Sequence, residues 1–225
     1  MSAAMAERLL IIGASGHAHA VLAMLRRRGG PVVVGLIDDT RPAGGLVFGL
    51  PVLGGVADVP QLCDAYGLDQ AVLAIGDNGQ RQRLAERLQH LVPALRWPVL
   101  VDPTAVVAEP ARLDAGTVVL AFAHVGPGAR LGPGCLLNTR SSLDHDGCME
   151  PFASLAPGAH CGGQVHLGER AAIGLGASLV QRVAVGADTV VGAGSLVLRS
   201  LPGGVVAYGS PARVVRPRQP LEAYL

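Results

Sequence analysis

A histidine next to a carboxylate is the pair in this sequence best suited to proton transfer, because Asp146 directly follows His145. An imidazole titrates near neutral pH and can act as a general base, and a neighbouring carboxylate tunes its basicity. The alternative is an exposed turn histidine followed by an aspartate that stabilises the turn. Of these two interpretations we favour His145 as a catalytic base. The other histidines in this half of the chain are His124, His160 and His166.

A second candidate site is the turn Gly13-Ala14-Ser15-Gly16, which follows an apolar run and opens a helical pattern. N–H groups at the start of a helix can hold a phosphate, and Asp38 stands where an acidic residue could accept ribose hydroxyls. The turn lacks the second glycine of the dinucleotide fingerprint, which argues against a dehydrogenase. The alternative is a plain strand-to-helix turn without a ligand, in which His17 caps or packs.

The first hundred residues must position that turn, and they alternate between strand and helix patterns. Apolar and β-branched runs predict strands over 9–12, 31–37 and 70–75, and helical spacing predicts helices over 17–28, 56–66 and 78–90. This order indicates an α/β domain over residues 1–100, with a small Rossmann-like parallel sheet covered by helices.

After Val101 the period of the sequence changes to six. Every sixth residue from Val107 to Val197 is apolar, and the residue two positions before each is nearly always small. Period six fits neither a helix nor plain alternation, and it predicts a parallel β-helix of hexapeptide repeats over residues 101–225. Three repeats make one coil, and stacked coils lie about 4.8 Å apart. We interpret the glycine that often follows the apolar residue as a turn residue, and the tail after Leu201 as a cap.

The coil of three repeats brings distant residues together. Gly163 lies one full coil after His145, so we expect the two on the same edge of the β-helix, one above the other. A base beside a main-chain N–H suits a reaction that develops an oxyanion. Leu175 and Ala193 are also one coil apart and stack on a different edge. A three-histidine metal site is not expected, because the spacing of His124, His145 and His166 exceeds one coil and makes them drift off one edge.

Composition and charge exclude several classes of protein. The formal net charge is +1, with both signs interspersed, which gives no electrostatic footprint for nucleic acid. The four cysteines show neither a C-x-x-C pair nor zinc spacing, so we expect reduced core thiols. The apolar run near the N-terminus is too short for a signal peptide, and no run reaches membrane-spanning length. We therefore expect a cytoplasmic protein without a membrane partner.

Five motifs outside the core positions occur in a fixed order on this hexapeptide frame. Together they resemble the bacterial nucleotide-sugar N-acetyltransferases of the PglD/PerB type and the related NeuD sialic acid O-acetyltransferases, over almost the whole chain. The motifs are Gly13-Ala14-Ser15-Gly16-His17-Ala18, Ile37-Asp38-Asp39, Ala74-Ile75-Gly76-Asp77-Asn78, Asn138-Thr139 with His145-Asp146, and Tyr208-Gly209-Ser210-Pro211-Ala212-Arg213.

The resemblance implies a left-handed β-helix, acetyl-CoA as the co-substrate and a homotrimer. It implies that His145 is the general base, that Asp146 tunes it, and that the N–H of Gly163 polarises the thioester carbonyl. Three positions fall where relatives contact the donor: Leu175, Ala193 and Ser154, the last replacing a histidine of one relative. The positions that fall where relatives hold the nucleotide-sugar are Ser15, Gly16, His17, Asp38 and Asp39.

From this resemblance we expect an N-acetyltransferase that uses acetyl-CoA and acts on a UDP- or dTDP-linked 4-amino-4,6-dideoxyhexose in polysaccharide biosynthesis. The amine would attack the thioester directly, in a cleft between subunits, with no metal and no covalent enzyme intermediate. One alternative is a sialic-acid-type sugar O-acetyltransferase. The other is a non-enzymatic β-helix protein that binds sugar nucleotides.

Overall fold

The computed structural model describes residues 7–224 and divides them into two compact units. An α/β unit contains residues 7–76 and 83–98, and a β-helix unit contains residues 77–82 and 99–224. Within this part of the chain, no helix is long and apolar enough to cross a membrane.

The α/β unit contains a sheet with the strand order β3-β4-β2-β1-β5. All neighbouring strands are parallel except β3 and β4, which form an antiparallel hairpin in the turn-rich segment that the sequence left without a strand. The predicted α/β class is confirmed. The strands are β1 (Arg8–Ile12), β2 (Val32–Ile37), β3 (Leu46–Val47), β4 (Leu50–Gly54) and β5 (Ala71–Leu73), and the helices are α1 (Gly16–Arg28), η1 (Val56–Asp58), α2 (Val59–Tyr66) and α3 (Asn78–Leu91).

Side-chain alternation along β1 buries both faces of this sheet. Leu10 and Ile12 belong to one core cluster with Cys63 of α2 and Leu88 of α3, whereas Leu9 and Ile11 point to the other face and are equally buried. The helix α1 ends where Gly29 takes a left-handed conformation, which a glycine adopts without strain.

The strand order of the sheet has a topological switch point at the carboxyl end of β1. The chain runs from β1 outward to β2 and β4 and then returns to place β5 on the other side of β1. In open parallel sheets, ligands bind outside the carboxyl ends of the strands at such a switch point. The turn at Gly13, the aspartates after β2 and the glycines after β4 all lie at this edge.

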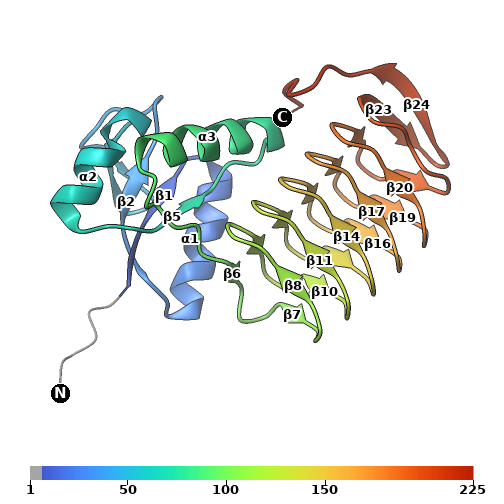
Figure 1. The fold of residues 1–225 in the computed structure, drawn as a ribbon, viewed down its shortest axis with the longest axis horizontal. Helices are drawn as coiled ribbons and strands as arrows, with labels where there is room; N and C mark the ends of the chain where they lie inside the picture. The colour runs from blue at the N-terminus through green and yellow to red at the C-terminus, as the bar shows by residue number, and fades with distance from the viewer. Residues whose placement is uncertain (1–6, 225) are drawn as a thin grey trace. The chain divides into compact units, whose positions relative to one another are not determined.

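The β-helix unit is a stack of coils with three flat walls (Figure 1). The six-stranded wall contains β7 (Val106–Val107), β10 (His124–Val125), β13 (Ser142–Leu143), β16 (His160–Cys161), β19 (Ser178–Leu179) and β22 (Leu196–Val197). The five-stranded wall contains β8 (Arg112–Leu113), β11 (Arg130–Leu131), β14 (Cys148–Met149), β17 (His166–Leu167) and β20 (Ala184–Val185). The eight-stranded wall contains β6 (Leu100–Val101), β9 (Val118–Val119), β12 (Leu136–Leu137), β15 (Ser154–Leu155), β18 (Ala172–Ile173), β21 (Val190–Val191), β23 (Val205–Gly209) and β24 (Ala212–Pro217).

The period of six and the coil of three repeats are both confirmed. Each repeat forms a two-residue strand whose second residue is the predicted apolar one, and parallel partners stand one coil apart along the chain, as in Val125 with Leu143. These apolar side chains form one continuous core with the small residues that precede them, such as Ala123 and Ala129.

The prediction that the glycine directly after each apolar residue forms the turn was wrong. The left-handed residue of each turn stands three positions after the apolar residue, as at Gly128, Gly158 and Gly176. The glycine directly after the apolar residue serves close packing instead, because a Cβ on Gly126 would lie 2.6 Å from the backbone of the next coil. Several non-glycine residues also occupy the left-handed position: Phe122, Arg140, Asp146, Phe152, Gln164, Arg170, Arg182 and Asp188.

The tail closes the last coil. Leu201 forms a bridge with Val185, and the hairpin of β23 and β24 extends the eight-stranded wall, with Ala212 reaching the core. This is the segment for which a cap was expected from the sequence.

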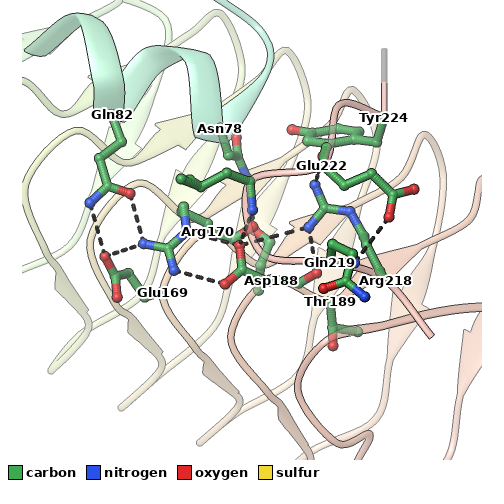
Figure 2. A network of polar contacts seen from close by, with 12 residues as sticks. Asn78, Gln82, Glu169, Arg170, Asp188, Thr189, Arg218, Gln219, Glu222 and Tyr224 are labelled. Atoms are coloured by element: carbon green, nitrogen blue, oxygen red, sulfur yellow. Dashed lines mark hydrogen bonds and ion pairs between the residues drawn. The ribbon is translucent and has the colours of Figure 1, made fainter.

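A network of polar contacts joins residues 77–82 and the tail to the edge between the five- and eight-stranded walls (Figure 2). Arg81, only 2% exposed, donates to the carbonyls of Gly134 and Phe152 at 3.0 and 2.8 Å. Arg170 binds both carboxylate oxygens of Asp188 at 2.8 and 2.7 Å, and these hydrogen bonds hold the pKa of Asp188 below its usual value. The start of α3 is thus hydrogen-bonded to main-chain carbonyls of the coils, which gain donors that they would otherwise lack.

Candidate active site

His145 lies on the edge between the six-stranded and five-stranded walls, in the turn that joins β13 to β14. Its Nδ1 is 2.9 Å from the carboxylate of Asp146, which occupies the left-handed position of the turn with a φ of 57°. Both side chains are about half exposed. When Nδ1 carries the proton and donates a hydrogen bond to the carboxylate, the lone pair of Nε2 is available to take a proton from a bound molecule.

Gly163 lies under the imidazole, one coil further along. The coil register is fixed by Gln164, whose N–H donates to the carbonyl of His145 at 2.8 Å. A Cβ on Gly163 would lie 2.5 Å from Cε1 and 2.7 Å from Cδ2 of His145, and closer still to Nε2. The absence of a side chain at Gly163 therefore creates the place in which the ring rests. Within residues 7–224, the N–H of Gly163 donates no hydrogen bond.

The surroundings make His145 a stronger base than a free histidine. The hydrogen bond with Asp146 raises its pKa above the usual value, slight burial opposes this, and the negative charges of Asp144 and Asp146 raise the pKa further. The positive charge of Arg182 acts in the opposite direction.

The residues assigned to the donor lie on other parts of the β-helix. Leu175 and Ala193 stack on the edge between the eight- and six-stranded walls, and both are exposed. Ser154 lies on the eight-stranded wall, where it is 7% exposed and its side chain hydrogen-bonds that of Tyr224. The six-stranded wall thus separates the edge of Leu175 from the edge of His145 in one chain.

In the α/β unit, Ser15 and Gly16 are exposed where α1 begins, whereas His17 is half-buried and its Nε2 atom is inaccessible to solvent. Ser15 stands at the N-cap without a side-chain cap, and the first turn contains no acidic residue. Nothing lies within 4 Å of the position that a Cβ on Gly16 would occupy. The N–H groups at the start of a helix favour an anion, so this turn is the part of the unit best suited to bind one.

The two aspartates after β2 are already engaged in the protein. Asp38 accepts hydrogen bonds from the N–H of Ala14 at 2.9 Å and from both the N–H and the hydroxyl of Thr40. Burial acts to raise its pKa, but these hydrogen bonds outweigh burial, and the pKa of Asp38 is lowered. Asp39 accepts the N–H of Val56 at 2.7 Å. Both carboxylates therefore shape the edge of the sheet, and contact with a ligand would use their remaining lone pairs.

The histidines of the rejected metal site lie on different walls. His124 belongs to β10 of the six-stranded wall and His166 to β17 of the five-stranded wall, with His145 at the edge between them.

Comparison with known proteins decides the family. Residues 8–88 match the family model of the PglD N-terminal domain. The structure of PerB from Caulobacter crescentus, in complex with CoA and GDP-perosamine, is 35% identical, with 96% of this chain and 100% of that chain covered and a TM-score of 0.86. This chain belongs to the PglD/PerB family of nucleotide-sugar N-acetyltransferases.

Other members and relatives agree with this assignment. The acetyltransferase domain of PglB from Neisseria gonorrhoeae is 32% identical over 93% of this chain and all of that chain, with a TM-score of 0.86. Serine acetyltransferase 2 from Arabidopsis thaliana is 30% identical over 62% of this chain and 38% of its own length. The chain spans 26–38% of the length of the curated relatives that it matches. The left hand of the β-helix, which the resemblance implied, is that of this family.

Reasoning from the sequence did not predict that Asp144 and Arg182 act on the imidazole. Asp144 precedes His145, accepts its N–H at 2.7 Å and adds a second negative charge. Arg182 stands two coils beyond Asp146 on the same edge, held by Gln164 at 2.9 Å. The sequence could have predicted the position of Arg182, because residues 146, 164 and 182 are spaced by one coil length each.

Proposed function

We propose that this chain transfers the acetyl group of acetyl-CoA to the amino group of a nucleotide-linked amino sugar, with His145 as the general base. The observation that carries the proposal is the position of the imidazole, which is oriented by Asp146 at 2.9 Å and rests on Gly163. A base and a free main-chain N–H on neighbouring coils are the two groups that aminolysis of a thioester requires.

The chemistry follows from these two groups. The sugar amine attacks the thioester carbonyl, and Nε2 of His145 takes the proton that the amine loses as the C–N bond forms. The N–H of Gly163 donates to the carbonyl oxygen, on which negative charge develops. Cleavage of the C–S bond then releases the CoA thiolate, which takes the proton from the His145 imidazolium, and the amide product remains on the sugar.

The acceptor is proposed to bind to the α/β unit through its phosphates. The exposed start of α1 offers N–H groups for a diphosphate, and Asp38 and Asp39 are close to the same edge of the sheet. We expect a 4-amino-4,6-dideoxyhexose carried on UDP or dTDP. Because PerB is described with GDP-perosamine, a GDP-linked sugar belongs in the same test.

The donor is proposed to lie between neighbouring copies of the chain in a homotrimer. In one chain the edge with Leu175 and Ala193 is separated from the edge with His145 by a whole wall. An acetyl-CoA molecule that touches both kinds of edge would therefore use two subunits. Ser154 stays a candidate contact of the acetyl donor, although its side chain hydrogen-bonds Tyr224 in the single chain.

We also retain the prediction of a cytoplasmic location.

The decisive experiment measures release of the CoA thiol from acetyl-CoA with UDP-, dTDP- and GDP-linked amino sugars. In His145→Ala we expect turnover to fall by a factor of about 100 or more, while light scattering shows an unchanged assembly. His90→Ala, which removes an exposed histidine at the end of α3, is the matched control and should keep full activity. Full activity in His145→Ala would refute the base.

Two alternatives are separated in the same assay. An O-acetyltransferase for sialic-acid-like sugars would acetylate a free sugar hydroxyl, and calorimetry would detect no binding of nucleotide diphosphates. A sugar-nucleotide-binding protein without activity would bind the nucleotides but release no thiol with any acceptor.

A further inference from the structure

The outer surface of the five-stranded wall brings together three side chains that can bind metal ions. Cys148 and His166 are directly opposite each other in the parallel ladder of β14 and β17, and Glu150 follows β14. The donor atoms of all three lie within 4.8 Å of one another. Cysteine, histidine and a carboxylate are the ligand types found in zinc sites.

The individual distances are close to those of a coordination sphere. The Sγ atom of Cys148 is 3.8 Å from Oε1 of Glu150, and the same oxygen is 3.9 Å from Nε2 of His166. Tetrahedral zinc with bonds of about 2.3 Å to sulfur and about 2.0–2.1 Å to nitrogen or oxygen separates its ligands by roughly 3.3–3.6 Å. The two distances to Oε1 of Glu150 are a few tenths of an ångström above that separation, and the distance from Cys148 to His166 is at most 4.8 Å, so rotamer changes would have to bring the side chains together.

This combination is not a default of the repeat. In the position of Glu150, the coils before and after carry Gly132 and Gly168, which offer no ligand atom. One coil before Cys148 the same position is Arg130, and one coil after His166 it is Ala184; neither side chain ligates a metal. The three ligand types therefore occur together at one point of a wall that the fold can build without them.

Cys148 differs from the thiols of the core, which contradicts the expectation that all four cysteines are core residues. Burial raises the pKa of both Cys135 and Cys161 to about 12, and these thiols point into the β-helix. Cys148 is only partly buried on the outer surface. Burial and the charge of Glu150 raise its pKa as well, and a divalent cation would reverse this by stabilising the thiolate.

We propose that Cys148, Glu150 and His166 form a site for a divalent cation of the zinc class, with three protein ligands and one position open to solvent. Two charged ligands and a neutral imidazole balance the charge of the ion. The mixed set of sulfur, nitrogen and oxygen favours zinc over magnesium or calcium, which prefer oxygen alone. Arg130 opposes the ion, because its guanidinium faces the sulfur from the neighbouring strand. The site is separate from the proposed transfer reaction, in which the ion takes no step.

The test uses the full chain, reduced and freed of metal by a chelator, with zinc chloride or cobalt chloride as the probe. Competition with a chromogenic chelator should show one zinc ion per chain. Cys148→Ala and His166→Ala should each weaken binding at least tenfold, and Arg130→Gln should strengthen it. His160→Ala is the matched control, since it removes an exposed histidine from a neighbouring wall.

Cobalt provides a second readout that does not depend on affinity. The wild-type chain should show a thiolate-to-cobalt charge-transfer absorption that is lost in Cys148→Ala. Thermal melting of each metal-free variant checks that the β-helix is intact. The proposal would be overturned if the wild-type chain bound no zinc. It would also be overturned if folded Cys148→Ala and His166→Ala bound zinc as tightly as the wild type.

Discussion

Substitution of Gly163 by alanine tests whether the imidazole needs the place that this glycine leaves. The new methyl group would lie 2.5 Å from Cε1 of His145, whereas carbon atoms in contact stay about 3.5 Å apart. The ring must therefore retreat by roughly 1 Å, and such a displacement of a catalytic group can cost on the order of 100-fold in rate. Since the clash is with the end of an exposed side chain, the fold should be preserved.

The assay is thiol release under saturating acetyl-CoA, combined with a thermal melt. We expect kcat of Gly163→Ala to fall about 100-fold, with a melting temperature close to that of the wild type. Gly30→Ala adds a methyl at ordinary contact distance, 3.5 Å or more from Arg28, and controls for the substitution itself.

A double variant makes the reasoning refutable. If the methyl acts by displacing His145, then Gly163→Ala should cost little in a His145→Ala background, since the effects of coupled residues are not additive. An equally large loss in that background would show that the methyl acts elsewhere, for example on the bound thioester. Unchanged activity in Gly163→Ala alone would show that the ring does not work from the position seen here.

Three further substitutions test other contacts. Asp146→Asn keeps a hydrogen-bond acceptor but removes the carboxylate whose hydrogen bond and charge raise the pKa of His145. Since the base acts only when neutral, the acidic limb of the pH profile of kcat/KM should move to lower pH. An unmoved limb would contradict the pairing. Arg81→Ala leaves one buried and one partly buried carbonyl without this donor, so chemical denaturation should show that the free energy of unfolding falls by about 2–4 kcal/mol. The exposed Arg83→Ala should lower it by less than about 0.5 kcal/mol. Asp38→Ala removes the acceptor of the Ala14 N–H. Calorimetry should show that the affinity for a nucleoside diphosphate falls about tenfold or more, which is near 1.4 kcal/mol. Wild-type affinity would show that Asp38 does not contribute to the binding site.

The β-helix was the part of the fold most accessible to prediction, because its period depends on local sequence alone. Each inward residue from Val107 to Val197 repeats one steric requirement, and one coil length then fixes which residues are neighbours. The position of Gly163 under His145 follows from that arithmetic. In contrast, the hairpin of β3 and β4 has only a two-residue first strand, too short to produce a recognisable pattern.

The polar network at the start of α3 was outside the reach of sequence patterns. Asn78 and Arg81 read as ordinary polar residues of an amphipathic helix, yet both are almost completely buried. Their partners are carbonyl groups of Gly134, Phe152, Arg170 and Ala171, which any sequence provides. Only tertiary packing distinguishes these polar residues from solvated ones. The grouping of Cys148 with His166 was accessible in principle, since they stand one coil apart, but a search for short cysteine spacings does not find it.

The three-walled coil also determines which changes of length the protein could tolerate during evolution. Deletion of a single repeat between β14 and β18 would preserve the hydrophobic period and close without a gap. It would nevertheless rotate every later residue by one wall, so Leu175 and Ala193 would leave their edge while His145 stayed in place. Deletion of three consecutive repeats would restore the walls and shift the later residues by one step along the axis. Lineages of this family should therefore differ in length by whole coils wherever the two edges must keep serving the same pair of molecules.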